Sequence, residues 1–233
     1  MPSLAEPDNA RPAQNAGGDL AAVILTGGGS TRMGRPKAWL DLGGRPLLLQ
    51  VARQVRPLVR EIVVVAAQDQ TLPALDEVTL DDPASSHAPT PCLITVIRDR
   101  VPDLGPLPAL ALGLETIRAA HAFALACDAA LVQRAVLQLL ARERTRARAV
   151  IPLWDGRAQP LVAIYARRLA PDLARLAASG ERRLQAILQL TDVQQLAAEQ
   201  FQGCDPEGVS FRSLNTPGDY AAARAIWASR SDR

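Results

Sequence analysis

Short apolar runs alternate with segments of helical periodicity along most of this chain. The runs stop at glycine, proline or polar residues, as strands buried on both faces of a sheet often do. Between them, apolar residues recur at the spacing of an amphipathic helix. We expect strands at residues 21–25, 61–67, 93–97, 122–127, 149–153 and 161–165. We expect helices at residues 46–59, 106–120, 132–142, 169–178, 183–190 and 219–229.

This order of elements predicts a Rossmann-like three-layer α/β/α fold, in which helices cover both faces of a mostly parallel central sheet. In such a sheet, ligands bind beyond the carboxyl ends of the strands. Three loops are therefore candidates for a binding site: those that follow Leu25, Ile97 and Cys127.

The composition and net charge of the chain limit the class of protein. Residues 1–19 are rich in proline and glycine and read as a flexible tail, and residues 20–233 are expected to form a single domain. No apolar run is long enough for a membrane span, and the N-terminus has no secretory pattern. A net charge of +2 does not indicate a nucleic-acid partner. Three widely spaced cysteines suit a reducing compartment, so we expect a cytoplasmic protein. Because no apolar run is long enough for a membrane span, we expect no membrane partner.

A glycine-rich loop with two cations follows the first strand. It contains Gly27, Gly28 and Gly29, then Arg32 and Lys37. Glycines let the backbone approach an anion closely, and the two cations add charge, so the loop is expected to bind phosphate groups. It fits neither the Walker A pattern nor the G-x-G-x-x-G fingerprint.

Lys37 is also unusual for its rarity. Lysine and arginine together number 26, and Lys37 is the only lysine among them. A surface charge tolerates exchange between lysine and arginine, whereas a phosphate contact by a compact ammonium often does not. The basic run from Arg142 to Arg148 is best read as a solvated helix end.

The loop sequence LTGGGSTRMGRPK, continued by DLGGRPLL, resembles the signature of the MobA-type nucleotidyltransferases. Further similarities follow in order along residues 20–228. Asp99 and Asp128 match two aspartates of that family. The branch that makes the molybdenum guanine dinucleotide cofactor is indicated by three later segments, which are Gln159–Pro160–Leu161, the GERR run at 180–183, and Asn215–Thr216–Pro217.

The resemblance implies an enzyme with the nucleotidyltransferase fold that transfers GMP from GTP to molybdopterin and releases pyrophosphate. Mg²⁺ would be the cofactor, held by Asp128 as the metal ligand. Arg32, Lys37 and Asp128 would be the catalytic residues. The other ligand contacts implied are Leu25, Thr26, Gly27, Gly28, Asp99, Gly105, Leu107, Arg182, Arg183 and Asn215. The partners implied are GTP, molybdopterin, and molybdoenzyme apoproteins or their chaperones.

Within this assignment, the last three residues are expected to serve the acceptor. Arg182, Arg183 and Asn215 come from the C-terminal half of the chain, which would bind molybdopterin. The N-terminal half, through Asp128, would bind GTP.

Several residues depart from the family pattern and leave alternatives open. Ala129 and Ala130 follow Asp128, where the family usually has a proline two residues on. Residues 66–68 contain no asparagine after the second expected strand, although the family has a nucleotide-contacting one there. A CTP-dependent relative, another phosphorylated acceptor and a non-catalytic carrier therefore remain alternatives. A dinucleotide-binding oxidoreductase is disfavoured because the fingerprint fails.

Each candidate side chain also has an ordinary structural interpretation. Asp128 could cap a helix, and Asp99 and Asn215 could be turn residues. Arg182 and Arg183 could be a solvated helix start. Cys127 reads as a buried core residue rather than a reactive thiol.

Overall fold

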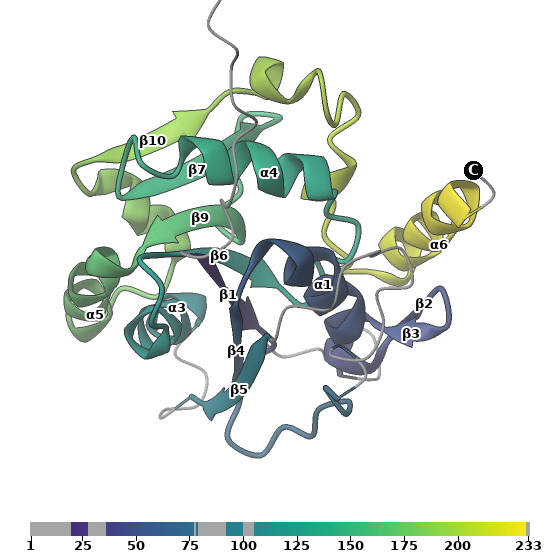
Figure 1. Ribbon diagram of the computed structural model, residues 1–233, viewed down its shortest axis with the longest axis horizontal. Helices are drawn as coiled ribbons and strands as arrows, with labels where there is room; N and C mark the ends of the chain where they lie inside the picture. The colour runs from purple at the N-terminus through teal and green to yellow at the C-terminus, as the bar shows by residue number, and fades with distance from the viewer. Residues whose placement is uncertain (1–19, 28–35, 77, 79–91, 100–104, 232–233) are drawn as a thin grey trace, which may run out of the picture.

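The computed structural model describes residues 20–27, 36–76, 78, 92–99 and 105–231 (Figure 1). The expectation of a flexible tail at residues 1–19 lies outside these ranges. Within the described chain, no helix is long and apolar enough to cross a membrane.

Eight of the described strands form one large sheet. Its order is β10-β7-β9-β6-β1-β4-β5, with β8 paired to β7 at the side. The expected strands appear as β1 (Leu20–Leu25), β4 (Glu61–Ala66), β5 (Leu93–Arg98), β6 (His121–Ala126), β7 (Ala149–Trp154) and β9 (Val162–Ala166). The sheet continues through β8 (Arg157–Ala158) and β10 (Val193–Leu196). The single domain expected for residues 20–233 stays a prediction.

Strand register brings the carboxyl ends of four parallel strands to one edge of the sheet. Leu25 of β1 is level with Val65 of β4 and with Ala126 of β6. Val65 is in turn level with Ile97 of β5. The three candidate loops named from the sequence therefore emerge side by side, as expected for parallel strands.

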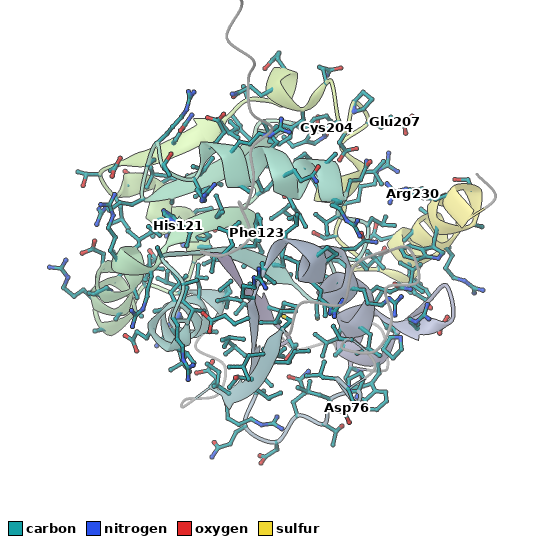
Figure 2. The ribbon with its side chains drawn as sticks, viewed as in Figure 1. Asp76, His121, Phe123, Cys204, Glu207 and Arg230 are labelled. Atoms are coloured by element: carbon teal, nitrogen blue, oxygen red, sulfur yellow. The ribbon has the colours of Figure 1, made fainter. Side chains whose placement is uncertain are left out.

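Helices cover both faces of this sheet, which confirms the three-layer fold. On one face, α1 (Leu47–Val55) and α4 (Arg134–Glu143) pack over a core that contains Phe123, a fully buried side chain in the middle of the molecule (Figure 2). On the other face, α3 (Pro106–Thr116) and α5 (Ala170–Ala178) lie side by side (Figure 1). The last helix, α6 (Pro217–Ser231), lies at one side of the molecule and ends near the C-terminus.

Short 3-10 helices occupy several connections. They are η2 (Lys37–Trp39), η3 (Arg56–Leu58), η4 (Arg167–Leu169), η5 (Leu184–Gln189), η6 (Ala198–Phe201) and η7 (Val209–Phe211). The helix expected at residues 183–190 is thus present as η5, with the tighter 3-10 winding.

The sheet is mostly parallel, but β9 runs against its neighbours. It pairs antiparallel with β6 on one side and with β7 on the other. Between β7 and β9 the chain turns through Asp155 and Gly156, both with positive φ, and forms the small strand β8. The sequence pattern identified the strands but not the reversed direction of β9.

The helix expected at residues 106–120 ends earlier than its pattern suggested. It stops at Thr116, and the next residues are held by Glu61 at the start of β4. Glu61 Oε1 accepts hydrogen bonds from the amides of Arg118 at 2.5 Å and of Ala119 at 2.9 Å. These amides would otherwise continue the helix, so a buried carboxylate from a distant strand determines where α3 ends.

Besides β8 and several of the 3-10 helices, two further elements were not anticipated from the sequence. One is the strand β10 at the sheet edge. The other is a hairpin of β2 (Asp41–Leu42) and β3 (Arg45–Pro46). Its turn residues Gly43 and Gly44 both have positive φ, as a two-residue hairpin turn requires.

An aromatic cluster fixes the loop that leads into η7. Trp154 stacks on Phe211 with ring centroids 5.3 Å apart, and Phe201 meets Phe211 edge to face at 5.1 Å. Gly208 has a φ of +59° directly beneath the indole ring of Trp154. A side chain at this position would both adopt a left-handed backbone and overlap that ring.

We therefore expect Gly208→Ala to lower the free energy of unfolding by about 2–4 kcal/mol, from backbone strain and overpacking together. Gly203→Ala is the matched control, since a Cβ there would meet open space and its φ is not positive. Urea denaturation of both variants measures the difference. Equal midpoints for the two variants would contradict this account of the loop.

Candidate active site

A cavity of about 790 Å³ opens at the edge of the sheet where the parallel strands end. It is lined by the ends of β1, β4 and β6, by the start of α3, and by three segments from the C-terminal part of the chain, at residues 159–162, 182–185 and 210–213. The residues that line it are Leu25, Thr26, Gly27, Lys37, Val65, Ala66, Ala67, Asp99, Gly105, Pro106, Ala109, Ala126, Cys127, Asp128, Ala129, Gln159, Pro160, Leu161, Val162, Arg182, Arg183, Leu184, Gln185, Ser210, Phe211, Arg212 and Ser213.

A lysine and an aspartate form the charged centre of this cavity. Lys37 begins η2, and Asp128 follows β6 by two residues. Lys37 Nζ lies 2.6 Å from Asp128 Oδ2, and the side chains are 21% and 13% exposed. Lys37 Nζ also donates a hydrogen bond to Asn215 Oδ1 at 2.7 Å. Three segments far apart in sequence therefore meet at one ammonium group.

The start of α3 faces the same cavity. Gly105 is its N-cap residue and has a φ of 79°, a conformation that favours glycine. Pro106 occupies the first helical position, where its missing N–H costs little. The N-terminal end of a helix carries unpaired N–H groups and partial positive charge, so this end of α3 favours an anionic ligand.

The arginine pair of the GERR run also lines the cavity and is ordered by Glu181. The Glu181 carboxylate accepts hydrogen bonds from the amides of Arg182 and Arg183, both at 2.8 Å, and from Arg183 Nε at 3.3 Å. These donors lower the pKa of Glu181 to about 2, with the amide of Arg183 the largest cause. The carboxylate therefore stays ionised at neutral pH and holds the loop.

The backbone at Gly105 lies close to the backbone of the GERR run. A Cβ on Gly105 would lie 3.0 Å from the carbonyl oxygen of Arg182. The absence of a side chain at Gly105 thus allows the GERR run to pack against the start of α3.

Gln70 is a site residue that sequence reasoning missed. It follows β4, and its amide links two strand ends. Gln70 Nε2 donates to the carbonyl of Thr26 at 3.2 Å, while Gln70 Oε1 accepts from Thr26 Oγ1 at 2.9 Å and from the amide of Ala67 at 3.2 Å. Arg98, at the end of β5, donates to the carbonyls of Ala67 at 3.0 Å and Gln70 at 2.6 Å. This clamp, made of Gln70 and Arg98, ties the ends of β1, β4 and β5 behind the cavity wall.

A signal for Gln70 did exist in the sequence. The resemblance implied an asparagine at residues 66–68, and the amide residue Gln70 lies two positions beyond that segment. An amide side chain is suited to this place because it can donate to one backbone group and accept from another.

The structure places most predicted site residues in the cavity. Those that line it are Leu25, Thr26, Gly27, Lys37, Asp99, Gly105, Asp128, Arg182 and Arg183. Gly28 and Arg32 lie outside the described residues. The side chain of Leu107 is fully buried in the core formed by α3 and α5 rather than in the cavity, because it faces the sheet from α3.

Two predicted residues are engaged differently from what the sequence suggested. Thr26 was expected to offer its backbone to a nucleotide, but its amide donates to Val65 at 3.0 Å and its carbonyl accepts from Gln70. Asn215 was expected with the arginine pair, and it instead contacts Lys37.

The chemistry available here is electrostatic. Cys127 lines the cavity, but burial, and then the charge of Asp128, raises the pKa of its thiol to about 12, so the thiol stays neutral. The hydroxyl of Ser210 accepts a hydrogen bond from the amide of Gln133 and is largely buried. The cavity therefore suits direct transfer between two bound anionic groups more than attack by a protein nucleophile.

Comparisons with known proteins agree with this geometry. The family model described as MobA-like NTP transferase domain matches residues 22–198. A Mycobacterium marinum protein named "Probable molybdenum cofactor guanylyltransferase" is 33% identical over 210 residues, which cover 87% of this chain and 92% of that protein. A Mycobacterium tuberculosis protein of the same name is 36% identical over 184 residues, covering 74% and 81%.

A solved structure is similar as well. Molybdopterin-guanine dinucleotide biosynthesis protein A from Archaeoglobus fulgidus superimposes with a TM-score of 0.70 at 25% identity. The match covers 90% of this chain and 99% of that chain.

The clamp behind the cavity wall yields a stability prediction. Gln70→Ala removes the partners of the Thr26 carbonyl and the Ala67 amide, so we expect it to lower the free energy of unfolding by about 1–3 kcal/mol. Gln68→Ala, at an exposed position in the same loop, should change it by less than about 0.5 kcal/mol. Thermal or urea denaturation of both variants compares them, and a Gln70→Ala protein as stable as Gln68→Ala would contradict the role of the clamp.

Proposed function

The chain belongs to the MobA-like NTP transferase family, and from this we propose that it is a nucleotidyltransferase that transfers GMP from GTP to molybdopterin. The products are the molybdopterin guanine dinucleotide cofactor and pyrophosphate. Relatives named molybdenum cofactor guanylyltransferase cover most of the chain, which supports the guanylyl reaction over other members of the family.

The observation that carries this proposal is the Lys37–Asp128 pair at the carboxyl ends of β1 and β6. Guanylyl transfer brings two phosphate groups together, and their repulsion must be offset by positive charge in a partly dry cleft. Lys37 supplies a compact ammonium group there, and Asp128 supplies a carboxylate for a second cation.

The proposed reaction is a single displacement. The terminal phosphate oxygen of molybdopterin attacks the α-phosphorus of GTP, and the bond from that phosphorus to the bridging oxygen of the β-phosphate breaks. Pyrophosphate leaves with the bonding electrons. A phosphate nucleophile is already ionised at neutral pH, so the step requires no general base from the protein. Lys37 stabilises the charge that develops on the phosphoryl oxygens.

A divalent cation fits the donor set of this cavity. Mg²⁺ is commonly held by one or two carboxylates together with substrate phosphates and waters. Asp128 provides such a carboxylate, already in contact with a cationic group. Among the described residues no cluster of three metal-binding side chains exists, so the phosphates of the substrate would complete the site. When bound, Mg²⁺ would neutralise phosphate charge and orient the triphosphate.

The segments that line the cavity suggest which substrate each group contacts. Gly27 and Asp99 follow the ends of β1 and β5, line the same cavity as Lys37, and would contact GTP. Arg182 and Arg183 come from the GERR run and would hold the phosphate of the acceptor. The close approach of Gly105 to the GERR run keeps the two groups within one cavity.

Compartment and downstream partners follow from the same proposal. Cys92, Cys127 and Cys204 are all free thiols, which suits the reducing cytoplasm. The product is a cofactor that other proteins bind, so molybdoenzyme apoproteins or their chaperones would receive it.

The proposal is tested by incubating the purified protein with molybdopterin and Mg²⁺ and with GTP, CTP or ATP in separate reactions. Mass spectrometry of the product should identify the guanine dinucleotide, with pyrophosphate released in equal amount. A cytosine product would make the protein a cytidylyl relative. Tight binding without any product would make it a carrier.

Removing the charged centre should abolish turnover without unfolding the protein. We expect Lys37→Ala and Asp128→Asn each to lower kcat by at least about 100-fold, the size of effect seen when one electrostatic contact to a transition state is lost. Asp128→Asn should in addition require more Mg²⁺, since an amide is a weaker ligand than a carboxylate. Mg²⁺ titration of activity measures this, and an unchanged titration would show that the metal lies elsewhere.

Removing the arginine pair should affect only the acceptor. We expect Arg182→Ala together with Arg183→Ala to weaken molybdopterin binding by about 1–3 kcal/mol and to leave GTP binding nearly unchanged. Arg134→Ala together with Arg224→Ala removes two exposed arginines outside the cavity and is the control. Calorimetric titration with each ligand separately decides the matter. Loss of GTP affinity with molybdopterin affinity retained would reverse the assignment.

A further inference from the structure

Lys37 is held at the cavity by an amide from the other end of the chain. Its Nζ donates to Asp128 Oδ2 at 2.6 Å and to Asn215 Oδ1 at 2.7 Å. An ammonium group only donates hydrogen bonds, so the amide oxygen of Asn215 is the atom that serves it. Of these two partners, Asp128 is charged and Asn215 is neutral.

Asn215 is itself fixed by the first turn of α6. Asp219 Oδ2 accepts hydrogen bonds from the amides of Asn215 at 3.1 Å and of Thr216 at 2.8 Å. In return, Thr216 Oγ1 accepts from the amide of Asp219 at 3.1 Å. These reciprocal bonds are those of a capping box, and they set the direction in which the chain enters the helix.

The helix in turn packs against the segment that follows Lys37. Tyr220 donates a hydrogen bond from its hydroxyl to the carbonyl of Asp41 on β2. Trp227 lies so close to Gly43 in the hairpin turn that a Cβ there would overlap its ring. Helix α6 lies beside β2 and β3 (Figure 1). The support of Asn215 and the segment that carries Lys37 thus form one packed unit.

In the proposed reaction, Asp128 would lose its contact with Lys37, whereas Asn215 would keep its own. Asp128 is the carboxylate that a divalent cation requires, and the triphosphate competes for the ammonium group. Lys37 must therefore exchange its contact with Asp128 for a phosphate oxygen. The neutral Asn215 can stay bonded to Lys37 during this exchange, because it attracts neither the cation nor the phosphate as a charged group would.

We propose that Asn215 is a positioning residue that keeps Lys37 directed into the cavity while its ionic partner changes from Asp128 to the triphosphate. This inference rests on the proposed function. It assigns Asn215 to the nucleotide side of the cavity through Lys37, and not to the acceptor.

A double-mutant cycle tests the inference. Calorimetry measures the binding of GTP with Mg²⁺ to the wild type, Asn215→Ala, Lys37→Ala and the double variant. Asn215→Ala should weaken binding by about tenfold, as the loss of a hydrogen bond to a charged group does. In the Lys37→Ala background the same change should have less than about a twofold effect, because the two residues act as a unit.

Two further variants separate positioning from general damage. Asn215→Asp should bind GTP more weakly than Asn215→Ala does, since a second carboxylate both holds Lys37 and repels the triphosphate. Gly218→Ala changes the same turn of α6, where a Cβ would make only an ordinary contact with Thr216, and should bind GTP like the wild type. Equal thermal stability of Asn215→Ala and Gly218→Ala would exclude unfolding as the cause.

The outcomes that overturn the inference are distinct from failure of the proposed function. A tenfold loss on Asn215→Ala in both backgrounds would mean that Asn215 acts independently of Lys37. Unchanged GTP binding with weakened molybdopterin binding would make it an acceptor residue. The cycle is repeated with Mg²⁺ and pyrophosphate in place of GTP. If the wild type does not bind GTP, but Asn215 and Lys37 are coupled in the binding of pyrophosphate, guanylyl transfer is contradicted and the positioning of Lys37 is not.

Discussion

The alignment of four parallel strands determines where everything else in this molecule lies. Parallel pairing places Leu25, Val65, Ile97 and Ala126 in one row, so the segments that follow them leave the sheet together. Residues separated by up to a hundred positions then share one cavity without any long excursion of the chain. The clamp of Gln70 and Arg98 reinforces this row from behind by bonding the strand ends to one another. The cavity wall is thus an extension of the sheet.

Charge in the cavity is arranged in balanced pairs. Lys37 lies against Asp128, and the Glu181 carboxylate gathers the amides and guanidinium of the GERR run. Such pairing offsets the charges of Lys37 and Arg183 before any substrate arrives. Anionic substrates can then replace the carboxylates as partners of the cations. On binding, each cation would thus exchange a carboxylate partner for a phosphate partner.

Much of the fold was predictable because local patterns and buried strands agree. The apolar runs at residues 21–25 and 122–127 closely match the observed strands β1 and β6. The rarity of lysine pointed to Lys37, which does line the cavity. The direction of β9 was not predictable, since periodicity carries no information on which neighbour a strand pairs with. The end of α3 depends on Glu61, a contact made across the fold. The contacts that Gln70 makes with Thr26, and the bond between Asn215 and Lys37, likewise depend on tertiary proximity that sequence spacing does not encode.

Because the chain has a single lysine, chemical modification of its amines is unusually selective. Besides the α-amino group of Met1, the chain has one primary amine, and it sits partly exposed in the cavity beside Asp128. Apart from that terminal amine, an acylating reagent, an aldehyde or an amine-reactive fluorophore would therefore modify only the lysine in the cavity. A protease that cuts only after lysine would have a single peptide bond to attack, between Lys37 and Ala38. Occupancy of the cavity becomes something that can be read from one covalent bond, without altering a residue of the protein.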